Sequence, residues 1–255
     1  MILTKKIDSL HIQQYPDRKS LGDAAARAVA DKLRQQLKSK STVNMIFAAA
    51  PSQNEFIAAL VASVDMDWSR VRAFHMDEYI GLPKGAPQCF GNFLRAGLFS
   101  KLPFRSVDYL DGTAADLQEE CHRYTNLLKQ YPVDIVCMGI GENTHIAFND
   151  PHVADFNDPL RVKVVALDEA CRQQQVNDGC FDEIHAVPKQ ALTLTIPALM
   201  AADSIYCMVP GSNKAAAIRH TLQDDIDSRY PSTILRKHPQ AYLFIDTASA
   251  AELSV

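Results

Sequence analysis

The chain contains 255 residues, of which 47% are hydrophobic and 22% are charged, and its formal net charge is −4. This length and composition predict a globular protein with a sizeable core, organised as a single domain over residues 1–255. The acidic balance and the lack of a long basic run argue against nucleic acid as a partner. No apolar stretch approaches the length of a membrane span, so no membrane partner is expected.

The six cysteines are spread along the chain without a C-x-x-C pair. Several lie in apolar segments, which favours buried thiols in a reducing cytosol over a disulfide framework or a metal site. The N-terminal segment Met1–Asp8 lacks the apolar core of a signal peptide. We therefore expect a cytoplasmic protein.

In the first half of the chain, segments with helical and strand-like spacing of apolar residues alternate. Pro51 suits the first turn of a helix, and the early acids and late Lys129 of the last helix match the helix dipole. The predicted elements are a helix at 19–39, a strand at 43–48, a helix at 51–64, a strand at 71–75, a helix at 89–98 and a helix at 114–130.

The second half continues this alternation, and Asp168 is placed to cap a helix that follows it. The predicted elements are strands at 133–138 and 162–167, a helix after Asp168, a strand at 204–209, a helix at 212–222 and a strand at 241–246. The whole pattern predicts an α/β fold, a doubly wound and mostly parallel sheet with helices on both faces. Right-handed crossovers would then bring the loops after the strands to one edge of the sheet.

Polar side chains follow the predicted strand at 71–75, in the segment Phe-His-Met-Asp-Glu-Tyr-Ile-Gly-Leu-Pro at 74–83. Functional residues gather at such places because the end of a parallel strand aims side chains into a crevice. Adjacent residues of an extended segment point to opposite sides, so at most one of Asp77 and Glu78 is expected to face a ligand. The alternative is a carboxylate that only caps the next segment.

A second polar segment, Gly-Ile-Gly-Glu-Asn-Thr-His-Ile-Ala-Phe-Asn-Asp-Pro, follows the strand at 133–138. Asn143 or Asp150 could hold one nitrogen of His145 and free the other for proton transfer. The alternatives are a histidine that is hydrogen-bonded within a turn and a zinc site. No second histidine sits at ligand spacing, so no metal is predicted. Gly139-Ile140-Gly141 is only part of a dinucleotide fingerprint, so no cofactor is predicted.

Two junctions between a strand and a helix are candidate substrate contacts. Gly211-Ser212-Asn213-Lys214 opens a helix, where backbone N–H groups and a lysine attract an anion such as a substrate phosphate. The alternative there is a plain helix start with a solvated lysine. In the other junction, which ends in Ala50-Pro51-Ser52-Gln53, small residues permit close approach and Ser52 and Gln53 can donate hydrogen bonds.

Together these segments resemble the glucosamine-6-phosphate deaminase/isomerase family, from about residue 18 to about residue 246. The family shares its doubly wound fold with 6-phosphogluconolactonases. The chain resembles the deaminase branch in two places: Tyr79 follows the Asp-Glu pair, and Ile146–Asn149 follow the histidine. The motifs that carry the resemblance are Met76–Pro83, His145–Asn149, Val187–Thr193 and Gly211–Ala215.

The resemblance implies isomerisation and deamination of an amino-sugar 6-phosphate, from glucosamine or galactosamine, to a ketose 6-phosphate and ammonia. Asp77 would move a proton between C2 and C1, His145 would open the sugar ring, and Lys214 would hold the phosphate. The other implied site residues are Asn143 and Asp150 in catalysis and Ala50, Ser52, Gln53, Glu78 and Thr144 in substrate binding. The implied partner is a small-molecule sugar phosphate, with a possible homo-oligomer and no cofactor.

The sequence departs from the family at several of these positions. Asn143, Thr144 and Asp150 stand where the family usually has Asp, Gly and Glu. The arginine expected in the helix after Asp168 is replaced by the glutamine-rich stretch 173–177, which leaves fewer cations for a phosphate. The alternatives are therefore a 6-phosphogluconolactonase-like lactone hydrolase, which would release no ammonia, and a non-catalytic sugar-phosphate-binding sensor.

Overall fold

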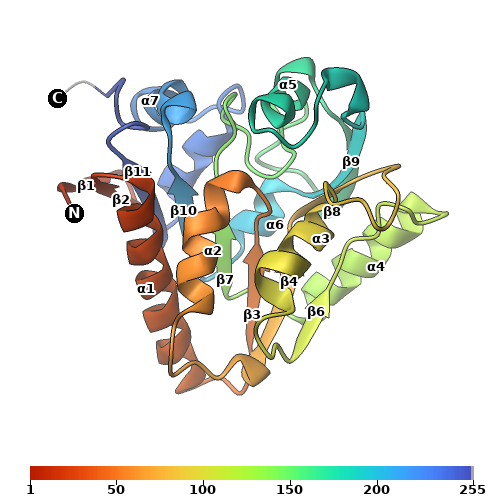
Figure 1. Ribbon diagram of the computed structural model, residues 1–255, viewed down its shortest axis with the longest axis horizontal. Helices are drawn as coiled ribbons and strands as arrows, with labels where there is room; N and C mark the ends of the chain where they lie inside the picture. Colours follow the sequence, from red (N-terminus) through yellow and green to blue (C-terminus); the bar gives the residue numbers. More distant parts are fainter. Residues whose placement is uncertain (254–255) are drawn as a thin grey trace.

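A parallel sheet forms the centre of the protein in a computed structural model that describes residues 1–253 (Figure 1). Its strands are β1 (Leu3–Ile7), β2 (Leu10–Tyr15), β3 (Val43–Phe47), β4 (Val71–His75), β6 (Ser106–Asp108), β7 (Ile135–Met138), β10 (Ser204–Val209) and β11 (Ala241–Asp246). The strand order is β1-β2-β11-β10-β7-β3-β4-β6. Only β1 runs antiparallel to its neighbour, and the other pairs are parallel. The predicted α/β class is confirmed.

Helices cover both faces of this sheet, as a doubly wound fold requires. Along β3, Met45 and Phe47 belong to the buried cluster that contains α1, α2 and α3, whereas Ile46 belongs to the cluster that contains α4, α6 and α7. This alternation follows from the two-residue period of a strand. The helices are α1 (Arg18–Leu37), α2 (Asn54–Val61), α3 (Phe90–Leu94), α4 (Leu117–Gln130), α5 (Glu169–Asn177), α6 (Ile196–Met200) and α7 (Ala215–Gln223).

A small antiparallel sheet lies beside the main one, with β5 (Asp77–Tyr79), β9 (Gln190–Leu194) and β8 (Val162–Ala166) in the order β5-β9-β8. The strand predicted at 162–167 forms, but it pairs with β9 here and not with the parallel series. Only one residue, Met76, separates β4 from β5. The chain therefore passes from one sheet to the other immediately before Asp77.

All the predicted helices and strands form, with their ends shifted by a few residues. Asp168 caps α5 as predicted, accepting a hydrogen bond from the backbone N–H of Cys171 at 2.6 Å. The helix predicted at 89–98 ends as a π-helical turn over Arg95–Phe99. The strands and α-helix that were not predicted are all three to six residues long: β1, β2, β5, β6, β9 and α6.

The strand order reverses between β3 and β7, which are neighbours in the sheet although β4 and β6 intervene in sequence. At such a point the loops that follow two strands diverge to opposite faces and leave a crevice between them. The loop after β3 is the junction that ends in Gln53, and the loop after β7 begins the polar segment that carries His145. Figure 1 shows α5 above this edge of the sheet. Within residues 1–253, none of the helices combines the length and apolar character needed to span a membrane.

The crossing of α1 over α2 depends on Gly22. A Cβ atom at this position would lie 2.7 Å from the backbone carbon of Glu55 and 2.8 Å from the backbone nitrogen of Phe56. We expect Gly22→Ala to lower the free energy of unfolding by about 1–3 kcal/mol, because overpacking outweighs the better helix propensity of alanine. Urea denaturation measures this change.

The matched control for that substitution is Gly85→Ala, since a Cβ atom there would meet nothing within 4 Å. We expect its unfolding free energy to stay within about 0.5 kcal/mol of the parent. Equal stability of the two variants would show that the helix crossing tolerates a side chain.

Candidate active site

Three of the predicted residues, Asp77, His145 and Lys214, line one pocket at the carboxyl edge of the sheet. Its volume is about 60 Å³, and Ala50 and Ser52 line it from the loop after β3. A wider cavity of about 310 Å³ shares Ala49, Ala50, Phe90 and Gln175 with this pocket as walls. A ligand larger than the inner pocket would therefore extend into the outer cavity.

Asp77 supplies a buried carboxyl group to the pocket. Asp77 is only 6% exposed. Among residues 1–253, no side-chain or backbone group donates a hydrogen bond to its carboxylate, whereas the neighbouring Glu78 accepts three. Burial, with a smaller contribution from the charge of Glu78, raises the pKa of Asp77 well above the ordinary value of 3.8. A carboxylate with a raised pKa, held at a strand end, is suited to act as a general base near neutral pH.

Glu78 points to the other side, as the alternation along the strand predicts. Its carboxylate accepts hydrogen bonds from the backbone N–H groups of Tyr79, Phe90 and Gly91 at 2.8–2.9 Å. It thus holds the start of α3 and lines a separate cavity of about 480 Å³. The structure places Glu78 outside the pocket of Asp77, in the capping role that was the alternative.

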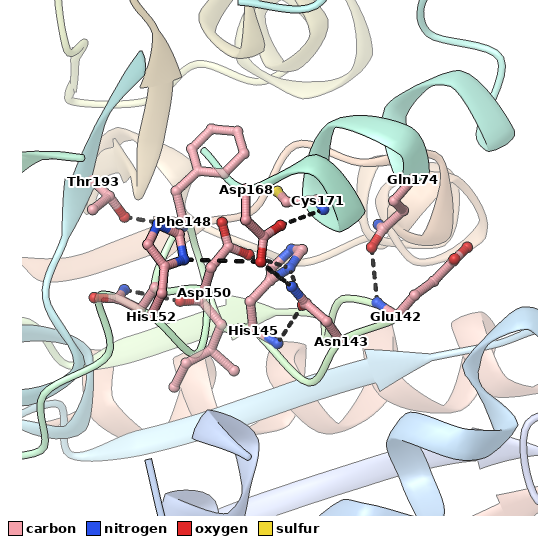
Figure 2. Close-up of polar contacts among 12 residues, drawn as sticks. Glu142, Asn143, His145, Phe148, Asp150, His152, Asp168, Cys171, Gln174 and Thr193 are labelled. Carbon is pink, nitrogen blue, oxygen red and sulfur yellow. Dashed lines mark hydrogen bonds and ion pairs between the residues drawn. The ribbon is translucent and has the colours of Figure 1, made fainter. Parts of the chain in front are cut away.

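The imidazole of His145 is held through one nitrogen (Figure 2). Its Nδ1 lies 2.7 Å from Oδ1 of Asn143 and 3.1 Å from Oδ1 of Asp150. Both partners are acceptors, so the hydrogen-bond network assigns the proton to Nδ1 and leaves the lone pair of Nε2 free. This arrangement agrees with the predicted roles of Asn143 and Asp150, which hold the histidine and do not line the pocket themselves.

The ring of His145 lies directly against the backbone of Gly141. A Cβ atom at Gly141 would come within 2.1–2.4 Å of three ring atoms. Glycine is therefore required at residue 141 because the imidazole approaches the backbone closely. The loop is closed by hydrogen bonds from the backbone N–H of Gly141 to the carbonyl of His145 and from that of Thr144 to the carbonyl of Gly141, at 2.9 and 3.0 Å.

The loop that carries His145 is fastened to β9. The side-chain amide of Asn149 donates to the carbonyl of Leu194 at 2.8 Å, and the backbone N–H of Phe148 donates to Oγ1 of Thr193 at 3.0 Å. Thr144 adopts a φ of 71° in this loop, and its side chain does not line the pocket. The structure therefore gives Thr144 a place in the loop backbone and no direct place beside a substrate.

The sequence missed two members of the histidine network, Asp168 and Cys171. The amide nitrogen of Asn143 donates to Oδ1 of Asp150 at 3.1 Å and to Oδ2 of Asp168 at 3.4 Å. Although burial alone would raise the pKa of Asp150, its hydrogen bond and charge interaction with His145 lower it below the ordinary value. In the sequence, Asp168 is recognisable only as a helix cap. In the structure it caps α5 and also contacts Asn143.

Lys214 is buried and aimed into the pocket, so the alternative of a solvated lysine is excluded. The residue is 3% exposed, and its ammonium group makes no hydrogen bond in the part of the chain that the structure describes. Burial lowers the pKa of Lys214, and the charges of Asp178 and Glu142 only partly oppose this shift. An anion in the pocket would stabilise the charged ammonium.

The side chains of α5 that line the pocket near Lys214 are neutral amides and not the arginine expected from the family. Gln175 and Gln174 line the pocket, and the guanidinium of Arg172 points away to the carbonyls of Ile184 and Val187. The predicted contact Gln53 does not line the pocket, because its amide donates inward to Ser52 Oγ and the Met208 carbonyl.

Comparison with known proteins supplies the family. The family model of glucosamine-6-phosphate isomerases/6-phosphogluconolactonase matches residues 16–244. A glucosamine-6-phosphate deaminase of Bacillus cereus is 35% identical over 209 residues, which are 82% of this chain and 77% of that protein. One of Streptococcus suis is 33% identical over 89% of this chain and 94% of its own.

Solved structures agree with this assignment. A monomeric glucosamine-6-phosphate deaminase, 27% identical, superposes with a TM-score of 0.86 over 94% of this chain and 98% of its own. The 6-phosphogluconolactonase of Thermotoga maritima, 18% identical, has the same fold with a TM-score of 0.76 over 93% of this chain and 100% of its own. The chain belongs to the family of glucosamine-6-phosphate isomerases and 6-phosphogluconolactonases.

Proposed function

We propose that this protein deaminates an amino-sugar 6-phosphate, with glucosamine 6-phosphate as the first candidate and galactosamine 6-phosphate as the second. The products are a ketose 6-phosphate and ammonia. The observation that carries the proposal is that a buried carboxylate, an oriented imidazole and a buried ammonium line the same pocket. The named relatives over most of the chain are glucosamine-6-phosphate deaminases, which supports this choice of substrate.

The two proton transfers of the reaction suit the two titratable groups. When the pyranose opens, Nε2 of His145 takes the proton of the C1 hydroxyl and delivers it to the ring oxygen as the bond between C1 and that oxygen breaks. Asp77 then removes the C2 proton of the open chain and delivers a proton to C1, through an enolamine intermediate. Water attacks the resulting C2 imine, and ammonia leaves. Carboxylate and imidazole suffice for these steps, so we propose no cofactor.

The phosphate of the substrate is assigned to Lys214. A buried ammonium without a protein partner is costly unless an anion joins it. Ser52 and the backbone at Ala50 offer neutral contacts on the same wall of the pocket. We also propose a cytoplasmic location, supported by six free cysteines of which five are buried. A homo-oligomer remains a prediction, and one structural relative is monomeric.

Ammonia release tests the proposal directly. We expect the purified protein to release ammonia from one of the two amino-sugar phosphates, measured separately by a coupled assay. Asp77→Asn should lower kcat at least about 10²-fold, because the amide cannot accept the C2 proton. A folded protein that releases no ammonia, but hydrolyses a phosphorylated sugar lactone, would contradict the proposal and favour the lactonase alternative. Stabilisation by sugar phosphates without any turnover would favour the sensor.

The pH dependence of kcat/KM reports the state of Asp77. The base acts only when it is deprotonated, so activity falls as the pH drops through its pKa. Because burial raises that pKa, we expect the acid limb to have its midpoint well above 3.8. A profile that stays flat down to the ordinary carboxyl range, with the protein still folded by circular dichroism, would rule out Asp77 as the base.

Among residues 1–253, Lys214 is the one Lys or Arg side chain that lines the pocket, so a second cation there should strengthen the binding of the phosphorylated substrate. We expect Gln175→Arg to lower KM for the phosphorylated substrate roughly tenfold or more, since charge-assisted hydrogen bonds contribute about 1.5–3 kcal/mol. The matched control is Gln173→Arg, which adds the same charge on the exposed side of α5. Steady-state kinetics measures both. Equal changes in KM for the two variants would indicate long-range attraction and no contact with the phosphate.

A further inference from the structure

Three metal-ligating side chains converge behind His145, on the side away from the substrate pocket. Figure 2 shows Asp150 and His152 from the loop after β7 together with Asp168 from the start of α5. One ligand atom from each lies within 4.8 Å of those of the other two. The side chain of Asp150 is fully buried, whereas those of His152 and Asp168 are 43% and 31% exposed. An ion could therefore enter this cluster from solvent.

His152 presents a lone pair to the cluster. Its Nε2 lies 3.0 Å from the carbonyl of Ala166, which can only accept, so Nε2 carries the proton. Nδ1 is then unprotonated and faces Oδ2 of Asp168 at 3.8 Å. A histidine whose far nitrogen donates to a backbone carbonyl has the second-shell arrangement typical of metal ligands.

The two carboxylates each have one oxygen that is only weakly engaged by donors. Oδ2 of Asp150 is buried and receives no N–H or O–H hydrogen bond among residues 1–253, and the weakly donating thiol of Cys171 lies close to the same carboxylate. Oδ2 of Asp168 receives only the long 3.4 Å hydrogen bond from Asn143. Lone pairs that gather in a partly buried site are stabilised by a cation among them.

We propose that Asp150, His152 and Asp168 form a binding site for Zn²⁺ or a similar borderline dication. An imidazole among the ligands favours such an ion over Mg²⁺ or Ca²⁺, which prefer oxygen ligands alone. Zinc bonds of about 2.0–2.2 Å to nitrogen and oxygen require ligand atoms that are closer than in the empty cluster. The half-exposed side chain of His152 can supply this movement. The site is distinct from the substrate pocket, which none of the three residues lines.

Zinc in this site would inhibit the enzyme. Asp150 supplies the negative charge beside Nδ1 of His145, at 3.1 Å. A dication bound to the same carboxylate competes with Nδ1 of His145 for its lone pairs, so the imidazole loses a partner that orients it. The inhibition rests on the proposed function, whereas the binding of zinc does not.

Calorimetric titration of the metal-free full chain with ZnCl₂ tests the binding. We expect one saturable site in the parent and in His122→Gln, a control that removes an exposed histidine of α4. His152→Gln should weaken the binding at least tenfold, and MgCl₂ should give no saturable heat. The proposal is overturned if the parent shows no saturable zinc binding, or if His152→Gln binds zinc as tightly as the parent.

Ammonia release tests the consequence in the same three proteins. Saturating zinc should slow the parent and His122→Gln at least about tenfold, with full recovery after EDTA. His152→Gln should have the activity of the parent without metal and keep it at that zinc concentration. Equal inhibition of His152→Gln would place the inhibitory zinc elsewhere. A parent that releases no ammonia from either substrate would count against the proposed function, while calorimetry would still decide the metal site.

Discussion

The contact between the imidazole of His145 and the bare backbone of Gly141 is the constraint around which the active-site loop is built. The ring leaves no room for a side chain at residue 141, so the chain must turn tightly between β7 and the histidine. That turn brings Asn143 within hydrogen-bond distance of Nδ1 of His145. The hydrogen bonds from Asn149 and Phe148 to β9 hold the part of the loop that follows the histidine. The small antiparallel sheet thus supports both walls of the pocket, because Asp77 begins β5 and β5 also pairs with β9.

The electrostatics of the site follow from burial. Desolvation raises the pKa of Asp77 toward neutral pH, which suits a general base. It also lowers the pKa of Lys214, so the charged ammonium depends on an anion in the pocket. Asp150 behaves differently, since its bond with His145 outweighs its burial and keeps it ionised. The departure from the family at Asn143 is consistent with this arrangement, because an amide there donates to two carboxylates that a third carboxylate would repel.

Local signals predicted much of this structure. Apolar periodicity located α1, α4 and the central strands, and the motif around His145 located its holding partners. The same signals could not separate Asp77 from Glu78, since both follow the same strand. Only the position of α3 decides which of the two carboxylates accepts hydrogen bonds from the start of that helix. Gln53 and Thr144 were expected beside the substrate, but the loops in which they lie turn their side chains away from the pocket. Short strands such as β5 and β6 carry too few residues to show a period.

The sequence by itself determined the class of fold, the family and the chemical types gathered at the ends of β4 and β7, because each of these depends on residues that are close together in the chain. Only the tertiary structure decided which of these side chains share a pocket. It placed β8 in an antiparallel sheet and brought Asp168 beside Asn143 and His152. Such pairings depend on contacts between segments that are distant in sequence, and neither periodicity nor motif spacing records them.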